Sequence, residues 1–181
     1  GQNGFTPMFC DTGWEHPLTL GYIEYVNRRF LGGRLERCQS EKYEDGMISL
    51  VSLRNGIPSS TRRFCTEELK VLPSIARIRE LECFYGDEVS VYQGIRADES
   101  DTRREAGRRL WDDRYDCWIN RPLYDWSVSQ VFDLHAKYDL EPNPLYKLGA
   151  GRVGCFPCVM INHGELKRLS VTLPEVWTQA E

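Results

Sequence analysis

The sequence has no apolar run close to the roughly 20 residues that a membrane-spanning helix needs, and it shows no signal peptide. It also has no Walker-type phosphate loop and no evident Ser-His-Asp set. The three histidines, His16, His135 and His163, lack the spacing of a metal-binding cluster. These absences argue against a membrane protein, a Walker-type nucleotide site and a histidine-based metal site, so other residues must carry the chemistry.

Lysine is also scarce, because the 23 basic side chains comprise 18 arginines and only 5 lysines. The net charge of −4 argues against a generally basic surface for nucleic acid. Six arginines fall between Arg96 and Arg114, interleaved with six carboxylates. For four of them this mixture predicts a solvated helix face whose charges pair with one another. These four are Arg104, Arg108, Arg109 and Arg114.

The seven cysteines bear on the compartment. An odd number without a secretory signal favours a reducing environment, so a cytoplasmic location is expected. The 181 residues, 41% hydrophobic and 28% charged, suffice for one globular domain with a sizeable core. The chain opens with Gly1 rather than Met and reaches strand-like sequence at Phe5. We therefore expect residues 1–181 to form a single domain that is part of a longer protein.

Short apolar runs alternate with helical stripes along the chain. Strands are expected at residues 6–10, 35–38, 89–93 and 117–123. Helices are expected at residues 17–30, 47–54, 66–81 and 127–138. Strands that alternate with helices predict an α/β fold with a mostly parallel sheet.

Several local signals refine these elements. Thr66 is expected to cap the third helix, and Pro73 to kink or restart it. Ser127–Gln130 has the pattern of a capping box. Asn143–Gly154 is predicted to be irregular, and a last helix is expected near Pro174.

The segment Gly94–Arg103 follows a predicted strand directly. Ligands of open α/β sheets bind outside the carboxyl ends of the strands, and the arginine fork suits phosphate and sulfate oxygens. Arg96, Ser100 and Arg103 are therefore candidate oxyanion-binding residues, and Gly94 would allow a sharp turn or a close approach.

The turn Asp11-Thr12-Gly13 ends the first predicted strand. It places a carboxylate, a hydroxyl and a flexible backbone at the same kind of sheet edge as the Gly94 segment. Turns of this composition are common, but the matching position makes all three residues candidates for the nucleotide site.

Three cysteines are candidate metal ligands. Cys155 and Cys158 form a Cys-x-x-Cys pair, which can hold a metal or act as a redox dithiol. Cys65 follows two arginines at an expected helix start, where we expect its pKa to be lowered. Together they could bind an iron–sulfur cluster or zinc, with Cys117 as the best candidate for a fourth ligand. The other cysteines read as small hydrophobic residues.

The chain resembles the phosphoadenosine phosphosulfate (PAPS) reductase family of the PP-loop, or adenine nucleotide α-hydrolase-like, superfamily. The matching segments occur in the family's order and cover most of the chain. They are Asp11–Pro17, Arg63–Lys70, Gly94–Arg103, Arg121–Trp126, Asn143–Tyr146 and Gly154–Cys158.

The resemblance implies a Rossmann-like sheet with helices on both faces that binds an adenine nucleotide, either ATP or PAPS. It implies that Asp11-Thr12-Gly13 contacts the nucleotide and that Arg96 and Arg103 hold its oxyanions. Family members with a [4Fe–4S] cluster use a Cys-Cys pair and a later Cys-x-x-Cys. Here Phe64-Cys65 stands in place of the Cys-Cys pair, which is similar to three-cysteine clusters of PP-loop sulfur-transfer enzymes.

The family's Ser-Gly-Gly-x-Asp-Ser loop and its C-terminal Glu-Cys-Gly-Leu-His segment are not in the sequence. We therefore expect a domain without its first strand and phosphate loop, with no catalytic residue assigned. The expected activity is sulfonucleotide reduction or ATP-dependent activation in sulfur transfer, involving a sulfur donor or acceptor protein. Two alternatives stay open: a non-catalytic nucleotide-binding or partner-binding domain with structural zinc, and an enzyme that modifies nucleic acid with sulfur.

Overall fold

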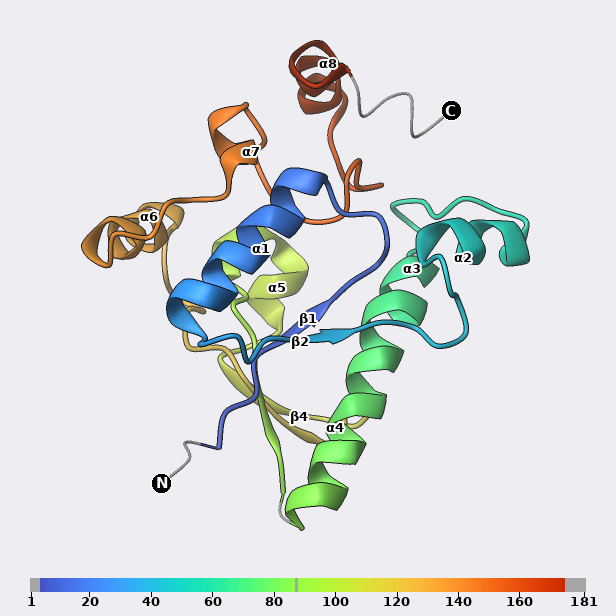
Figure 1. Cartoon of the computed structure of the whole chain (residues 1–181), viewed down its shortest axis with the longest axis vertical. Coiled ribbons are helices and arrows are strands. Elements are labelled where there is room, and N and C mark those ends of the chain that lie inside the picture. The colour runs from blue at the N-terminus through green and yellow to red at the C-terminus, as the bar shows by residue number, and fades with distance from the viewer. Residues whose placement is uncertain (1–3, 87, 175–181) are drawn as a thin grey trace. The chain divides into compact units, whose positions relative to one another are not determined.

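The computed structural model describes residues 4–86 and 88–174 (Figure 1). Contacts within the chain group these residues into two compact units. Of the described residues, the first unit comprises 4–74 and 143–174, and the second comprises 75–86 and 88–142. Each unit contains its own sheet and its own helices. The single domain expected from the sequence stays a prediction. None of the helices in the described ranges is long and apolar enough to cross a bilayer.

The first unit begins with a strand–helix–strand arrangement. β1 (Met8–Cys10) and β2 (Glu36–Cys38) are parallel neighbours, and α1 (Pro17–Phe30) connects them. Proline at the first helical position costs no hydrogen bond, and the His16 Nδ1 atom accepts the Leu18 N–H at 3.0 Å. All three elements fall where the sequence predicts them, and parallel strands joined by a helix confirm the α/β class.

A continuous helical stretch follows α2 (Met47–Arg54). It comprises α3 (Phe64–Thr66), a π-helix η1 (Glu67–Val71) and α4 (Leu72–Tyr85). The prediction that Thr66 caps this stretch is wrong, because the helix begins at Phe64 and Thr66 has helical dihedrals. Pro73 is the second residue of α4 and lies inside this continuous stretch, where the π-helix immediately before α4 interrupts the regular α-helical hydrogen bonds.

Among the residues that the structure describes, two apolar clusters lie in the core of the first unit. Cys65 packs against the cluster that contains Tyr43, and Phe156 packs against the cluster that contains Leu145. Both clusters therefore support segments that carry candidate site residues. The buried members are Tyr43, Met47, Leu50 and Leu69 in one, and Leu145, Ala150, Leu169 and Leu173 in the other.

The last part of the first unit contains two helices. The stretch predicted to be irregular includes a short helix, α7 (Pro144–Lys147), because the Asn143 side chain caps the Leu145 N–H at 3.0 Å. A longer helix, α8 (His163–Thr172), ends before Pro174. The helix predicted to start near Pro174 falls almost entirely outside the described residues.

The second unit contains a three-stranded sheet. β3 (Ser90–Tyr92) is parallel to the central β5 (Cys117–Asn120), and β4 (Arg109–Asp112) is antiparallel to it. The helices of this unit besides α4 are η2 (Ala97–Glu99), α5 (Asp101–Glu105) and α6 (Val128–Lys137). The capping box predicted at Ser127–Gln130 is present.

The helix face predicted for the arginine-rich run is only partly correct. Helix α5 ends at Glu105, Gly107 takes a positive φ of 67°, and Arg109–Asp112 is a strand. Trp111 faces Trp118 of β5 across the sheet, and alternate residues are exposed, which is the pattern of a half-buried strand. Charge pairing is present all the same, as Arg104 contacts Asp101 at 2.9 Å.

Gly46 offers a test of this packing. Its φ is +58°, and a Cβ placed on it would lie 2.0 Å from the Thr12 carbonyl oxygen. We expect Gly46→Ala to lower the free energy of unfolding by about 2–4 kcal/mol in urea titrations, because both strain and a backbone clash oppose it. Gly32→Ala is the matched control: φ is +60°, but no atom lies within 4 Å of its Cβ, so about 1 kcal/mol is expected. Equal losses would show that the close approach at Gly46 is not important.

Candidate functional site

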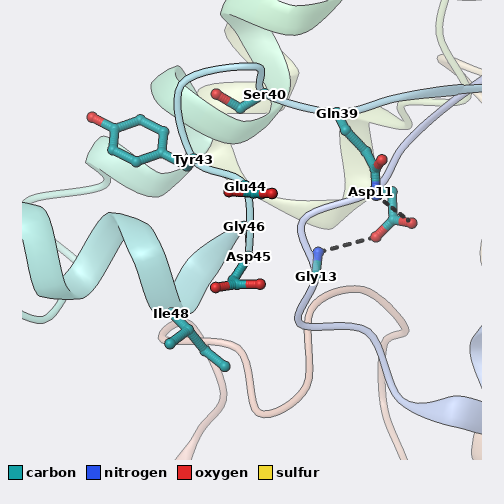
Figure 2. A pocket seen from close by; sticks show the side chains of 9 residues that line it. All are labelled: Asp11, Gly13, Gln39, Ser40, Tyr43, Glu44, Asp45, Gly46 and Ile48. Carbon is teal, nitrogen blue, oxygen red and sulfur yellow. Dashed lines mark hydrogen bonds between the residues drawn. The ribbon is translucent and has the colours of Figure 1, made fainter.

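The turn after β1 is held by the carboxylate of Asp11, which is 8% exposed. One oxygen accepts the Gly13 N–H at 3.0 Å, and the other accepts the Gln39 side-chain amide at 3.2 Å (Figure 2). Arg37 lies 3.5 Å from the second oxygen. Because Gln39 follows β2 directly, Asp11 ties the carboxyl ends of two parallel strands together.

A pocket of about 280 Å³ opens at these strand ends. Figure 2 shows it between the Asp11–Gly13 turn and the segment from Gln39 to the start of α2. Its lining residues are Asp11, Gly13, Gln39, Ser40, Tyr43, Glu44, Asp45, Gly46 and Ile48. The pocket lies where α/β folds bind ligands, and its lining includes carboxylates but no lysine or arginine.

A charge cluster lies behind one wall of the pocket. Glu68 of the π-helix pairs with Arg54, and Lys42 lies 3.7 Å from its other oxygen. Burial raises the pKa of Glu68, but Arg54, Lys42 and a hydrogen bond to Tyr43 outweigh burial and lower it overall. The buried Tyr43 is therefore linked to a cluster of three charges, which come from the loop before α2 (Lys42), the end of α2 (Arg54) and η1 (Glu68).

Thr12 connects this turn to the Cys-x-x-Cys segment. Its hydroxyl donates to Glu15 at 2.7 Å and lies 3.6 Å from the sulfur of Cys155. Glu15 and Cys155 form a β-bridge, and the Phe156 N–H donates to the Trp14 carbonyl at 2.7 Å. Residues 143 positions apart are therefore joined by backbone and side-chain hydrogen bonds.

Glu15 is held in a partly buried position by the same turn. Burial raises its pKa, the hydrogen bonds from Thr12 counteract this, and the nearby charge of Asp11 adds to the rise. The sequence reasoning missed Glu15, because a carboxylate three residues after Thr12 carries no distinctive pattern.

The three candidate ligand cysteines all lie in the first unit. Burial raises the pKa of Cys65, and the charges of Cys155 and Cys158 raise it further. The expected lowering is therefore wrong, because burial and the neighbouring thiolates outweigh the hydrogen bonds at Thr66 that lower this pKa. The guanidinium of Arg152 lies 3.7 Å from the sulfur of Cys158.

These thiols are close enough for their charges to interact, but they are not positioned as ligands of one metal ion. Within residues 4–86 and 88–174, no group of three His, Cys, Asp or Glu side chains is placed to hold a metal ion. Cys117, the candidate fourth ligand, is fully buried in β5 of the second unit.

The arginine segment lies in the second unit. Arg96 contacts Asp98 at 3.0 Å and Glu99 at 3.4 Å, and Arg103 pairs with Glu99 as well. Both guanidiniums therefore gather around one carboxylate, which an anionic ligand would have to displace. Ser100 caps α5 by accepting the Arg103 N–H at 3.2 Å.

Gly94 does not need its conformational freedom. No positive φ occurs there, and an added Cβ would make an ordinary contact of 3.9 Å with Leu123. The structure thus places Thr12 of the Asp11–Gly13 turn beside Cys155, and Arg96, Ser100 and Arg103 together in the other unit. That both sets serve one nucleotide stays a prediction.

Sequence reasoning also missed the wall of the pocket between Gln39 and Ile48. This segment is polar and has no periodic pattern, so only the glycine at its end could have pointed to it.

The segment Gly149–Gly154 matches the pattern Gly-x-Gly-x-x-Gly of the dinucleotide fingerprint. It follows α7 rather than a strand, so it lacks the structural context of that fingerprint.

The raised pKa of Cys65 predicts its reactivity. In reduced protein stripped of metal, we expect Cys65 to react with iodoacetamide more slowly than the exposed Cys83, because less thiolate is present at a given pH. Removing a neighbouring negative charge by Cys155→Ser should lower the Cys65 pKa and speed its alkylation. Cys38→Ser is the control. Mass spectrometry over a pH series measures both effects, and an unchanged Cys65 profile in Cys155→Ser would contradict the electrostatic coupling.

Comparison with known proteins identifies the family. A sequence profile of the phosphoadenosine phosphosulfate reductase domain matches residues 2–160. The structure is similar to that of the PAPS reductase from Candida auris in its phosphate complex, with a TM-score of 0.63 and 18% identity over 85% of this chain and 72% of that one. This likeness confirms the predicted α/β, Rossmann-like fold.

Curated relatives agree with the profile. The chain is 29% identical to an uncharacterized 37.8 kDa protein of Escherichia phage 186, covering 94% of this chain and 64% of that protein. It is 30% identical to an uncharacterized protein of Methanocaldococcus jannaschii (96% and 35% covered) and 32% identical to the adenosine 5'-phosphosulfate reductase of Allochromatium vinosum (82% and 56% covered). The chain thus spans between 35% and 64% of the length of these relatives. With the profile matching most of its length, the chain belongs to the phosphoadenosine phosphosulfate reductase domain family.

Proposed function

We propose that this domain binds an adenine nucleotide at the carboxyl ends of β1 and β2 and acts as an enzyme domain of sulfur metabolism. The reaction would be reduction of a sulfonucleotide or ATP-dependent activation for sulfur transfer. The observation that carries this proposal is the pocket of about 280 Å³ beside Asp11 and Gly13, at the sheet edge where this fold class binds ligands.

The charges around the pocket suggest how a nucleotide would be oriented. Carboxylates of Asp11, Glu44 and Asp45 line it without a lysine or arginine, so they suit the hydroxyl and amino groups of a nucleoside better than its phosphates. Considered by themselves, Arg96 and Arg103 of the second unit could hold an oxyanion, which would replace Glu99 as their partner.

Similar proteins support the same chemistry. Relatives include adenosine 5'-phosphosulfate reductases, and the similar solved structure is a PAPS reductase in a phosphate complex. Both names describe nucleotides that carry phosphate and sulfate. For this chain, an oxyanion-binding site and a sulfur acceptor or donor protein are therefore part of the proposal.

We further propose that Cys65, Cys155 and Cys158 hold a [4Fe–4S] cluster. Their soft thiolate donors and mutual proximity fit such a group, although the three side chains would have to draw together. When bound, a cluster of this kind supplies a redox-active and sulfur-rich centre. Thr12 would position Cys155 through its hydroxyl, so this side of the cluster would be fixed to the nucleotide turn.

Arg96 provides the test of nucleotide binding. We expect Arg96→Ala to weaken adenosine 5'-phosphosulfate or ATP binding by roughly 1.5–3 kcal/mol, about 10- to 150-fold, because a charge-assisted contact is lost. Isothermal titration calorimetry measures this. Arg104→Ala is the control, since Arg104 is exposed and pairs locally with Asp101. Equal affinity in both variants would remove Arg96 from the site, and no binding by the unaltered protein would refute the proposed function.

Metal analysis after anaerobic purification tests the cysteine assignment. Iron and acid-labile sulfide are expected in the protein, and Cys65→Ser, Cys155→Ser and Cys158→Ser should each lower both. Cys83→Ser is the matched control, because Cys83 is exposed and lies in the second unit. Stoichiometric zinc without sulfide would instead support a non-catalytic domain with a structural metal.

A further inference from the structure

The second unit contains another pair of neighbouring strand ends. β3 and β5 are parallel, with Tyr92 opposite Asn120, and the next residues are Gln93 and Arg121. The Gln93 N–H donates to the Asn120 carbonyl at 2.9 Å, so the two chains still lie side by side at this point. This is again the edge of a parallel strand pair at which α/β proteins bind ligands.

Arg121 is a buried arginine without a counter-charge. It is 7% exposed, and its Nη1 atom donates to the carbonyls of Ala106 at 2.8 Å and Gly107 at 3.0 Å. Among the residues that the structure describes, it makes no ion pair, and its buried Nε–H has no hydrogen-bond partner. A buried charge of this kind is unfavourable unless something neutralises it.

Other arginines of the same unit are neutralised by carboxylates. They are Arg79, Arg96, Arg103, Arg104 and Arg108. Carboxylates are therefore plentiful in this part of the chain. Arg121 is more buried than these five arginines, yet it pairs with no carboxylate among the described residues. The carbonyls that Nη1 contacts satisfy hydrogen bonds but carry no full negative charge.

Gln93 adds a second unpartnered group. Its side-chain oxygen is buried and makes no hydrogen bond. Since an amide can present either its oxygen or its NH₂ group to the same space, Gln93 can become a donor to an anion. The register of Tyr92 with Asn120, continued by one residue, pairs Gln93 with Arg121, and opposite residues of a parallel strand pair project to the same face.

We propose that Arg121 binds an oxyanion, a sulfate or phosphate group, through its free Nε edge, with Gln93 as a second donor. The Nε–Nη2 edge of a guanidinium matches two oxygens of such a group. Nε is buried, so the surrounding segments must open locally before the anion enters. The inference rests on the proposed function only for the identity of the molecule that carries the anion.

The same segment also fixes the loop that carries the other arginines. Arg121 holds Ala106 and Gly107 just after α5, and the Ala97 N–H donates to the Tyr124 carbonyl at 2.8 Å. Tyr124 in turn donates its hydroxyl to the Arg104 carbonyl. The loop from residue 94 to 107 is thus attached to residues 121–124 at both ends, so an anion on Arg121 would be linked to the positions of Arg96 and Arg103.

Side-chain NMR of the unaltered protein tests the proposal directly. We titrate ¹⁵N-labelled protein with sodium sulfate, then with phosphate, and follow the arginine Nε–H resonances, with chloride at matched ionic strength as the control. A saturable shift of the Arg121 resonance with sulfate and phosphate, but not with chloride, is expected. An Arg121 resonance that stays unchanged at sulfate concentrations that shift exposed arginines would overturn the proposal.

Two variants complete the experiment and identify the resonance. Arg121→Lys keeps the charge but loses the fork, so sulfate binding is expected to weaken about tenfold or more. Arg108→Gln is the control, because Arg108 is exposed and pairs with Asp125, and its sulfate affinity should equal that of the unaltered protein. If Arg121→Lys fails to fold, the titration of the unaltered protein still decides.

The sulfate titration is independent of the nucleotide experiment. Sulfate binding at Arg121 without adenine nucleotide binding would refute the proposed function and leave this site standing. Nucleotide binding with no response of Arg121 to sulfate or phosphate would refute the anion site and leave the proposed function standing.

Discussion

The close contact between the turn after β1 and its neighbours is the constraint on which the candidate site depends. Gly46 lies so near the Thr12 carbonyl that a side chain there would clash, and the Met47 N–H donates to the same carbonyl at 2.8 Å. On the other side, the Thr12 hydroxyl reaches Cys155. One residue therefore fixes the pocket wall and the cysteine segment at once. A shift of this turn would move both, so a ligand bound at the turn would be coupled to the position of Cys155.

Much of this arrangement follows from local sequence, and the reasons are physical. Proline at position 17, two glycines after the helix and short apolar runs on either side were enough to predict β1, α1 and β2. The Ser127–Gln130 capping box was equally clear, because reciprocal hydrogen bonds at a helix start involve residues three apart. In these cases the contacts that determine the structure join residues that are close together in the sequence.

Other features depend on partners that are distant in sequence. β4 could not be recognised because Arg109 and Asp112 look like helix-surface charges, and only the pairing of Trp111 with Trp118 makes the segment a strand. The Cys65 pKa was misjudged because the nearby arginines are obvious in the sequence, whereas burial and two thiolates some 90 residues later are not. The polar pocket wall before Met47 gave no periodic signal at all.

Each unit contains a group whose charge is unfavourable in its surroundings, a thiolate in the first unit and a guanidinium in the second. In the first, burial and the nearby charges of Cys155 and Cys158 raise the pKa of Cys65, and a bound cation would offset that repulsion. In the second, the buried Arg121 has no carboxylate partner among the described residues, and an anion would relieve its cost. Neither arrangement is favourable for a protein that binds nothing. A soft metal would relieve the first and an oxyanion the second, and these are the ligands that the two proposals assign to the cysteines and to Arg121.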